Sequence, residues 1–331
     1  MSNLLEIKDL KVCYHTYQGD VQSVRGVNLD IGYEESVALV GESGCGKSVT
    51  GKSILRLIQT PGEIREGSSI TFDGKDVLAM SKKELRSYRG GQASIIFQDA
   101  LASLNPTMTV GKQIMENLLY HRKMSKKEAK AEAVKLLKDV GIPQAEKRVD
   151  QYPHEFSGGM RQRVMIAMAL ACRPKILIAD EPTTALDVTI QAQILRLMNN
   201  LKKEKGTAIL FITHDLGVIN QMADDVAVMY CGQVVEMTPA RTIFDQTISP
   251  YLHPYTEGLL HSIPRLDTEA HTRLEVIPGS VPHPADLPVG CKFAPRCKYA
   301  TDRCRTEEPQ LVQVSPTQQV RCFYPGKEER K

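Results

Sequence analysis

The segment ESVALVGESGCGKSVTGKSILRLI constrains this 331-residue sequence more than any other. An apolar run at residues 37–40 leads into a loop with three glycines, and an amphipathic helical pattern begins at Lys47 and Ser48. This is the G-x-x-x-x-G-K-S pattern between a strand and a helix. Its glycines let successive backbone N–H groups turn toward phosphate oxygens. The segment therefore predicts a phosphate-binding loop, and a glycine-rich turn arising by chance is the alternative.

Each part of this loop has a chemical task. The helix N-terminus adds its dipole, Lys47 reaches the terminal phosphates, and the Ser48 hydroxyl is offered to magnesium. We expect ATP and Mg²⁺ to be held by Gly41, Ser43, Gly44, Cys45, Gly46, Lys47, Ser48 and Val49.

A second segment, ILIADEPTTALD, supplies carboxylates. Residues 176–179 are predicted to form a strand buried on both faces, which delivers Asp180 and Glu181 to its C-terminal end. Ligands bind at that end in open parallel sheets. We predict that Asp180 holds magnesium through its water shell and that Glu181 orients the attacking water, the alternative for Glu181 being a solvated strand-end carboxylate. Alternating strands and helices predict the α/β class.

Another glycine motif, FSGGMRQRVMIAMALACRP, places Ser157 at a helix N-cap, followed by Gly158 and Gly159. A helix N-terminus of this kind can bind an anion, although a plain N-cap explains the pattern equally well. Because the first loop already serves one nucleotide, a second site is useful only for a nucleotide held by another subunit. The motif thus favours a sandwich dimer.

Composition excludes several classes of protein. A formal net charge of +3 with 24% charged residues provides no basic stripe for nucleic acid. The longest apolar stretch, residues 165–172, is too short to cross a membrane, and MSNLLEIKDL lacks the order of a signal peptide. We expect a cytosolic protein that can lie against a membrane partner.

The eight cysteines form two groups. Cys13, Cys45, Cys172 and Cys231 are scattered and are expected to be packing residues. The other four are spaced C-x5-C-x6-C-x17-C in a proline-rich tail, at Cys291, Cys297, Cys304 and Cys322. Disulfides are not expected in the cytosol, so a cubane iron–sulphur cluster, zinc or free thiols remain for them. The change from alternating helices and strands to a proline-rich tail predicts a domain of residues 1–235 and an extension of residues 236–331.

Taken together, these motifs resemble those of the ATP-binding subunit of an ABC transporter, over residues 4–235. Residues 41–48 resemble the Walker A motif, residues 157–162 (SGGMRQ) the signature, and residues 176–181 the Walker B strand with its glutamate. Further likenesses are the Q-loop at Gln98 in IIFQDALASLNP, the D-loop at Ala185, Leu186 and Asp187, the switch histidine at His214 after AILFIT, and the adenine-stacking aromatic at Tyr14. Tyr17, close by, is the alternative to Tyr14.

The resemblance implies a mechanism and an assembly. Water positioned by Glu181 and His214 attacks in line while Lys47 and Mg²⁺ neutralise the phosphates, and Gln98 coordinates Mg²⁺ and reports the nucleotide state. The signature residues Ser157, Gly158 and Gly159 would complete the ATP site of a partner cassette, which is a second copy or a related chain.

A helical subdomain is expected at about residues 99–164. Ser125 and Glu128 form a predicted capping box, and one apolar face precedes Gly141, made of Ala129, Ala133, Leu136, Leu137 and Val140. The stripe resembles the part of the family that docks membrane subunits, and core packing explains it equally well.

Three segments, SLNPTMTVG, HPYTEGLLHSIPRL and IPGSVPHPADLPVGCKFAPRC, resemble the dipeptide and oligopeptide importer branch. That likeness implies import of di- or oligopeptides, two transmembrane permease subunits, an external peptide-binding protein, and a peripheral place on the cytoplasmic side of the cell membrane. It also implies a [4Fe-4S] cluster on the four tail cysteines, with zinc as the alternative. A nickel importer, a soluble ABC ATPase of DNA repair or translation, and a metal-sensing NTPase are the other functions considered.

Overall fold

The computed structural model describes residues 3–17, 19–99, 103–184, 186–245, 247–262, 276–326 and 330. The chain divides into two compact units. Unit 1 comprises Met1–Leu4, Ile31–Glu35 and Asp76–Ile212, and unit 2 comprises Leu5–Asp30, Ser36–Lys75 and Thr213–Lys331. Three stretches used above lie outside the described residues: Ala185 of the D-loop, residues 100–102 after Gln98, and residues 263–266 of the second importer-like segment, HPYTEGLLHSIPRL.

Unit 1 is built around parallel strands. They run in the order β7 (Ala93–Ile96), β8 (Ile176–Asp180) and β9 (Ala208–Thr213), with Ile178 of β8 opposite Ile95 on one side and Leu210 on the other. All residues of β8 and β9 are buried, as expected for parallel strands with both faces covered. The strand predicted at residues 176–179 is confirmed, and it extends by one residue to Asp180.

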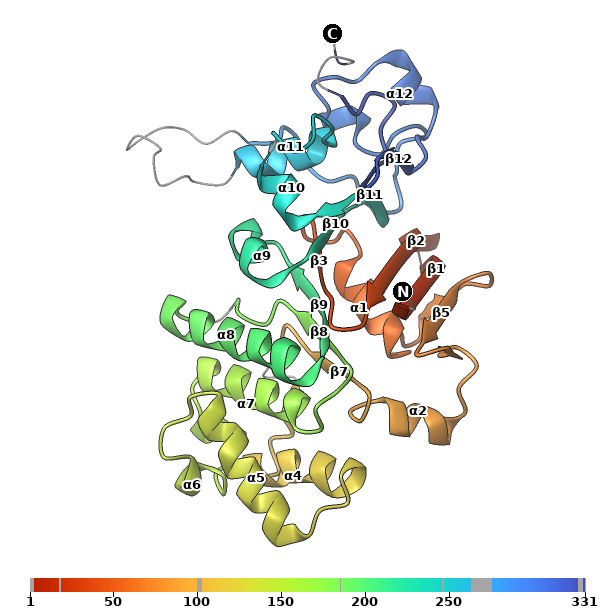
Figure 1. The fold of residues 1–331 in the computed structure, drawn as a ribbon. Coiled ribbons are helices and arrows are strands. Elements are labelled where there is room, and N and C mark those ends of the chain that lie inside the picture. Colours follow the sequence, from red (N-terminus) through yellow and green to blue (C-terminus); the bar gives the residue numbers. More distant parts are fainter. Residues whose placement is uncertain are drawn as a thin grey trace. The chain divides into compact units, whose positions relative to one another are not determined.

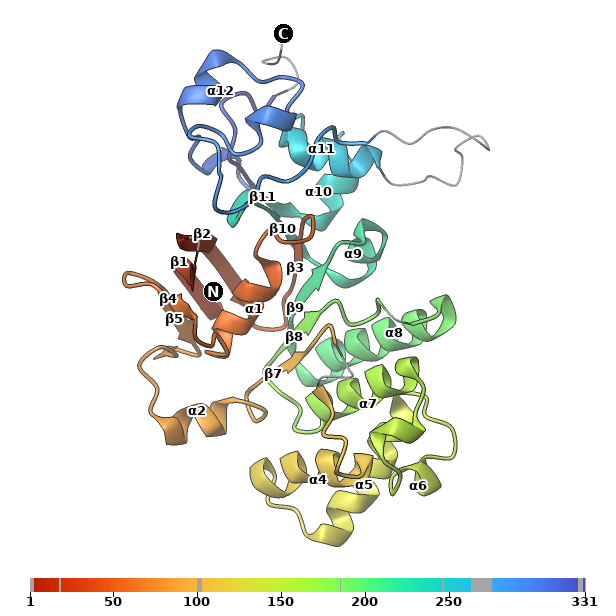
Figure 2. The same cartoon turned by 180° about the vertical axis from the view of Figure 1, so that it is seen from behind.

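The helices of unit 1 are α2 (Lys82–Tyr88), α4 (Val110–His121), α5 (Lys126–Asp139), α6 (Ala145–Arg148), α7 (Gly158–Leu170) and α8 (Val188–Lys205), with a 3₁₀ turn, η1 (Pro153–Glu155). Helices α4, α5 and α6 gather beside α7, as both views show (Figure 1, Figure 2). The capping box of Ser125 and Glu128 is confirmed. The predicted apolar face of α5 is buried except at Leu136, which is half-buried, and Gly141 follows with a φ of 73°.

Unit 2 contains an antiparallel sheet near the N-terminus. Its strands are β1 (Asn3–Thr16), β2 (Gly19–Gly32), β4 (Gly62–Ile64), β5 (Ser69–Phe72) and β6 (Lys75–Asp76). The order is β2-β1-β5-β6, and β4 pairs with the other end of β1. This sheet carries Tyr14 and lies beside α1 (Lys47–Ile54) in Figure 1.

A second group of strands in unit 2 joins the phosphate loop to the C-terminal extension. β3 (Ser36–Val40) pairs parallel with β10 (Asp225–Tyr230), and β10 pairs antiparallel with β11 (Gln233–Pro239). β11 then pairs with β13 (Gln318–Val320), which pairs with β12 (Val312–Ser315). The boundary predicted near residue 235 falls inside β11. The remaining elements are α9 (Leu216–Met222), α10 (Ala240–Phe244), α11 (Pro254–His261), η2 (Ala294–Arg296) and α12 (Asp302–Thr306).

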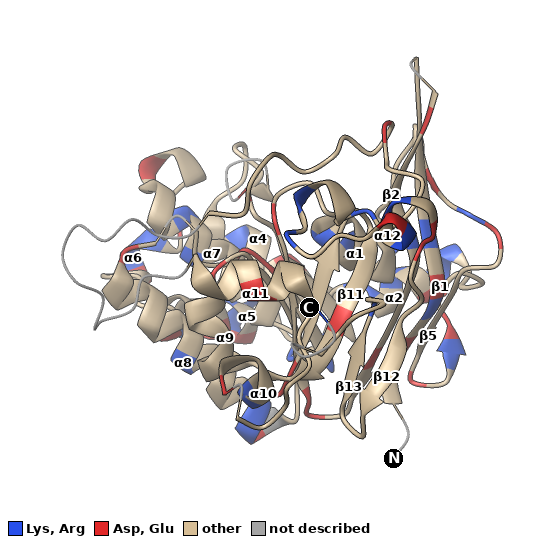
Figure 3. Ribbon diagram, turned by 90° about the horizontal axis from the view of Figure 1, so that it is seen from above, with Lys and Arg blue, Asp and Glu red and all other residues tan. Residues whose placement is uncertain are grey.

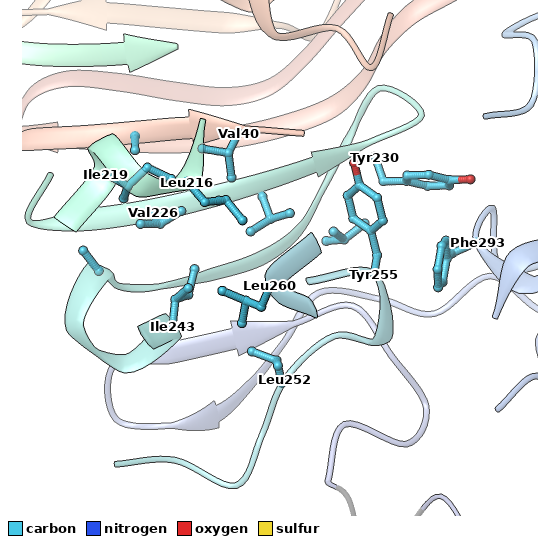
Figure 4. Packing of buried hydrophobic residues seen from close by; sticks show 14 of the residues in the cluster. Val40, Leu216, Ile219, Val226, Tyr230, Ile243, Leu252, Tyr255, Leu260 and Phe293 are labelled. Atoms are coloured by element: carbon cyan, nitrogen blue, oxygen red, sulfur yellow. The ribbon is translucent and has the colours of Figure 1, made fainter. Parts of the chain in front are cut away.

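One apolar core spans these strands and the extension. Val40 of β3 and Tyr230 of β10 belong to the same buried cluster as Tyr255 of α11 and Phe293, which precedes η2. Figure 4 shows the rings of Tyr230, Tyr255 and Phe293 close to one another, with Leu252 and Leu260 nearby. Since apolar burial is the main favourable term in folding, residues before and after position 235 stabilise one another.

Charge is mixed along the chain. Figure 3 shows Lys and Arg interspersed with Asp and Glu over most elements, in keeping with 42 basic and 39 acidic residues in the sequence. Within the described part of the chain, no helix combines the length and the apolar character that crossing a bilayer requires.

Candidate functional site

The phosphate loop leaves β3 and opens α1 in unit 2. Gly41 has a φ of 151° and Gly46 a φ of 103°, in the range that favours glycine. A Cβ atom at Gly41 would overlap the carbonyl oxygen of Met229, and one at Gly46 would overlap that of Ser23. Only glycine fits these two positions, so the motif's spacing has a steric cause in this fold.

The lysine of the motif is buried within the loop. Lys47 is 5% exposed, and its ammonium group donates to the carbonyl oxygens of Gly41 at 2.7 Å and Glu42 at 3.0 Å. Its Nζ also lies 3.7 Å from the sulphur of Cys45. Burial raises the pKa of the Cys45 thiol, so this side chain is a neutral packing group. Ser48 and Val49 lie in the first turn of α1, after Gly46 at its N-cap.

In unit 1, the C-terminal end of β8 brings two predicted residues together. The Gln98 side-chain amide donates to the Glu181 carboxylate at 2.9 Å, and Thr184 Oγ1 donates to the same carboxylate oxygen at 3.2 Å. Asp180, the preceding residue, is 2% exposed. Glu181 has a φ of 48°, an uncommon conformation for a residue other than glycine, and its N–H donates to Ile212 O at 2.9 Å. The strand end thus holds Glu181 in a fixed and strained position.

The signature residues begin α7. Ser157 is confirmed as the N-cap, because its hydroxyl accepts from the Met160 N–H at 3.4 Å. Apart from its chain neighbours and the backbone of its own helix, a Cβ added at Gly158 would meet no atom of the described residues within 4 Å, so packing against these residues does not require glycine there. Gly159 lies in the same first turn, and Asp187 is the N-cap of α8, accepting from Ile190 N–H at 3.0 Å. Capping accounts for the contacts of Ser157 and Asp187, and the openness at Gly158 leaves room for a further group.

His214 and Tyr14 belong to unit 2. His214 is exposed, and it directly follows β9 and precedes Asp215, the N-cap of α9. Tyr14 faces Gly62 across the β1–β4 pair, where a Cβ on Gly62 would come within 2.6 Å of the Tyr14 ring. The ring therefore lies against bare backbone, and partial burial raises the pKa of its hydroxyl. Tyr17, the alternative aromatic, is fully exposed.

The four tail cysteines meet at one pocket. Cys291, Cys297, Cys304 and Cys322 all line it, together with aromatic side chains that include Phe293 and Tyr324. Burial raises the pKa of Cys297 to about 11 and that of Cys322 to about 12, and neighbouring cysteines of the set raise both further. Cys304 is buried and the other three are half-buried. Four thiols with no acidic partner among them are the donor set of a thiolate-bound metal centre, and metal binding would release their protons.

The spacing of these sulphur atoms bears on the choice of metal. Four thiolates around one zinc ion, at about 2.3 Å each, lie about 3.8 Å from one another. Among the described residues, the one group of three or more metal-binding side chains that converges within 4.8 Å is Cys13, His15 and Asp20. The four tail cysteines do not form such a group.

The group at Cys13 is explained by ion pairs. Asp20 contacts His15 Nδ1 at 2.6 Å and Arg65 Nη2 at 2.6 Å, and His15 Nε2 lies 3.3 Å from Glu63. The Asp20 carboxylate raises the pKa of His15, which favours its charged form. An exposed network of this kind needs no metal.

Sequence reasoning missed three residues at the phosphate loop. The Glu42 carboxylate is bound by both terminal nitrogens of Arg296, at 2.6 and 3.0 Å, and the Glu42 N–H donates to the Tyr255 hydroxyl at 2.8 Å. Arg296 is 254 positions further along the chain. No local sequence pattern predicts this ion pair. The one available signal is that Arg296 directly precedes Cys297, a residue of the predicted four-cysteine site.

Comparison with known families gives two matches. A family described as "ABC transporter" matches residues 24–184, and one described as "Oligopeptide/dipeptide transporter, C-terminal region" matches residues 235–304. The two matches cover the phosphate loop, β8 and the first three tail cysteines.

Curated relatives align with nearly the whole chain. An oligopeptide transport ATP-binding protein of Bacillus subtilis is 53% identical over 98% of this chain and 89% of its own length. The oligopeptide transport ATP-binding protein of Escherichia coli is 50% identical over 98% of this chain and 94% of its own length. A dipeptide transport ATP-binding protein of Bacillus subtilis is 49% identical over 98% of this chain and 95% of its own length.

Among solved structures, a dimeric ATP-binding cassette in a post-hydrolysis state, bound to ADP and phosphate, has a TM-score of 0.66. It is 28% identical and covers 72% of this chain and 99% of its own. The likeness identifies the P-loop α/β fold of the ATP-binding cassettes.

Proposed function

The chain belongs to the ATP-binding proteins of the ABC transporter family, and we propose that it hydrolyses ATP to power the import of di- or oligopeptides. The observation that carries this proposal is the near-complete alignment with peptide transport ATP-binding proteins at about 50% identity, which includes the C-terminal extension. A match confined to the cassette would have supported ATP binding alone.

In the proposed mechanism, ATP and Mg²⁺ bind at the phosphate loop. Lys47 neutralises the terminal phosphates, and the Ser48 hydroxyl and Gln98 serve as magnesium ligands, with Asp180 acting through bound water. Tyr14 stacks on the adenine. Positioning and charge carry the rate, because no covalent intermediate is needed.

Glu181 and His214 are proposed to position the attacking water. The hydrogen bond from Gln98 and the contact from Thr184 orient the Glu181 carboxylate, which supports this role. Ser157, Gly158, Gly159 and Asp187 are proposed to face the nucleotide of a second cassette. The absence of any atom near a Cβ at Gly158 is consistent with a ligand supplied from outside the chain.

The assembly follows from the same family. We propose that the partner is a second ATP-binding subunit, identical or related, and that the pair docks on two transmembrane permease subunits. An external peptide-binding protein would act through the permease, with no contact to this chain. The protein would then be peripheral, on the cytoplasmic side of the cell membrane.

The catalytic role of Glu181 is tested by Glu181→Gln. The amide keeps the size of the side chain and a hydrogen-bond acceptor, but it does not polarise water as a carboxylate does. We expect the ATPase rate of the assembled transporter to fall by at least about 100-fold, with ATP still bound. Glu204→Gln, at an exposed position of α8, is the matched control. An unchanged ATPase rate in the Glu181 variant would exclude this role.

The transported solute is tested by uptake. Cells that carry Glu181→Gln in place of the natural chain should lose uptake of labelled di- or oligopeptides and keep uptake of nickel. Loss of nickel uptake alone would instead identify a nickel importer. Normal uptake of every solute would contradict a transport function.

For the extension, we propose that Cys291, Cys297, Cys304 and Cys322 bind a [4Fe-4S] cluster. Their convergence on one pocket supports a thiolate-bound centre, and the choice of a cluster over zinc comes from the resemblance to the peptide importer branch. When bound, the cluster would crosslink segments of the extension that have little regular secondary structure.

Metal analysis of anaerobically purified protein tests the cluster. We expect about four iron and four sulphide per chain, and Cys297→Ser should lose most of both. Cys172→Ser changes a half-buried cysteine outside the pocket and should retain them. Zinc without iron in the natural chain would overturn the assignment.

A further inference from the structure

The phosphate loop is held from one side by the C-terminal extension. Glu42 is the first residue after Gly41, so it lies within the loop whose N–H groups are proposed to receive phosphate. Two groups of the extension contact it: the Arg296 guanidinium binds its carboxylate, and the Tyr255 hydroxyl accepts from its N–H. Side chain and backbone of one loop residue are thereby fixed together.

The contact with Arg296 has the geometry of a strong interaction. Two parallel charge-assisted hydrogen bonds, at 2.6 and 3.0 Å, join the guanidinium to the carboxylate. The Arg296 side chain is 4% exposed, while that of Glu42 is 31% exposed. Arg296 Nε donates to Pro278 O at 2.9 Å, so the guanidinium plane is oriented by the extension before it meets the loop.

Tyr255 is equally well fixed. Its ring is fully buried and packs against those of Tyr230 and Phe293, with ring centroids 4.7 and 5.5 Å away. Figure 4 shows the three rings in the same part of the cluster. Because the ring is held in place, its hydroxyl restricts the position of the Glu42 N–H that donates to it.

Two of the tail cysteines flank the 3₁₀ turn that contains Arg296. Hydrogen bonds link Ala294 N–H to Cys291 O at 3.0 Å, Arg296 N–H to Phe293 O at 3.0 Å, and Cys297 N–H to Ala294 O at 3.3 Å. Five residues separate Cys291 from Cys297, and the last three of them form the 3₁₀ turn η2, which ends at Arg296. Any group that binds both thiolates fixes this turn.

We propose that Arg296 and Tyr255 are positioning residues that hold the phosphate loop through Glu42, so that nucleotide affinity is coupled to occupancy of the four-cysteine site. The coupling to occupancy rests on the metal centre proposed above, whereas the positioning role does not. A bound metal centre keeps η2 and Arg296 in place and pre-organises the loop. By reciprocity, bound nucleotide strengthens retention of the metal centre.

The positioning role is tested by nucleotide binding to the full chain, with trinitrophenyl-ATP as the fluorescent probe. We expect Arg296→Gln and Glu42→Gln each to raise the Kd by about fivefold, within the range of modest coupling energies. The double variant should be no weaker than either single variant, because both remove one interaction. Arg305→Gln, which removes an exposed positive charge from the same extension, is the control.

Two further measurements distinguish weaker nucleotide binding from loss of folding. Thermal unfolding followed by circular dichroism shows whether each variant is folded, and Tyr255→Phe removes only the hydroxyl that accepts from Glu42 N–H. We expect Tyr255→Phe to weaken binding as well. A Kd within twofold of the natural chain in Arg296→Gln and Tyr255→Phe, or additive effects in the double variant, would refute the positioning role.

The coupling is tested by comparing metal-loaded and metal-depleted protein. We expect depletion to raise the Kd by about fivefold in the natural chain and to have almost no effect in Arg296→Gln, where the connection is already broken. Equal affinity of loaded and depleted natural protein would overturn the coupling. If no preparation contains metal, the cluster assignment itself fails, and the Glu42–Arg296 cycle still decides the positioning role.

Discussion

At the scale of single residues, a buried carboxylate ties β11 to the extension. Glu236 is fully buried, and its oxygens accept from His253 N–H at 2.8 Å and from the Gln318 side-chain amide at 2.9 Å. Burial raises the pKa of Glu236 to about 7 from 4.5. The adjacent His253 ring is kept neutral by burial, which lowers its pKa to about 3, and its Nδ1 accepts from Tyr255 N–H.

The Glu236 shift predicts a pH-dependent stability. The Glu236 carboxyl group keeps its proton up to about pH 7 in the folded chain, whereas it loses this proton near pH 4.5 in the unfolded chain. Its contribution to the free energy of unfolding is therefore complete below pH 4.5 and is lost as the pH rises through about 7. From about pH 5 to about pH 8, the free energy of unfolding should fall relative to Glu236→Gln by on the order of 2 kcal/mol. Urea unfolding of both proteins measures this difference, and parallel pH profiles would contradict it.

At the scale of elements, the capping box at the start of α5 is the clearest local determinant of structure. Ser125 Oγ accepts from Glu128 N–H at 3.3 Å, and the Glu128 carboxylate accepts from Ser125 N–H at 2.9 Å. The Ser125 hydroxyl and N–H lower the pKa of Glu128. The same arrangement begins α2, at Ser81 and Glu84.

Removal of the α5 cap has a measurable cost. Ser125→Ala should lower the free energy of unfolding by about 1 kcal/mol, because the Glu128 N–H loses its partner in the first turn. Ser125→Asn keeps a side-chain acceptor and should restore most of that loss. Urea unfolding measures both, and an asparagine variant as unstable as the alanine variant would show that the cap is not the cause.

At the scale of the whole molecule, the extension is part of a core and not an appendage. Leu252, Tyr255, Leu260 and Phe293 share one buried cluster with Val40 and Tyr230. Full burial of a large apolar side chain contributes about 1.5–3 kcal/mol, so a few such residues approach the total stability of a domain, about 5–15 kcal/mol.

This core predicts the result of truncation. A chain that ends at Asp245 should lose cooperative unfolding and bind a hydrophobic dye, because β10 and β11 would expose the apolar residues that the extension covers. Calorimetry of the truncated and full-length chains measures the change. A truncated chain with the unfolding temperature of the full-length protein would show that the extension is an independent domain.

Features that depend on neighbouring residues could be predicted from the amino-acid sequence. The strands at residues 37–40 and 176–179 and the caps at Ser125 and Ser157 follow from short apolar runs and local hydrogen bonds. These interactions span only a few positions. The motifs also identified the family, because their order is carried by the chain itself.

The contacts between residues far apart in the sequence could not be predicted and are known from the folded chain. The contact of Gln98 with Glu181 spans 83 positions, that of Glu236 with Gln318 spans 82, and that of Glu42 with Arg296 spans 254. It also paired β13 with β11, the strand within which the boundary drawn from composition falls. No period or spacing encodes such partners, because a polar side chain pairs with whatever group packing brings within hydrogen-bond distance of it.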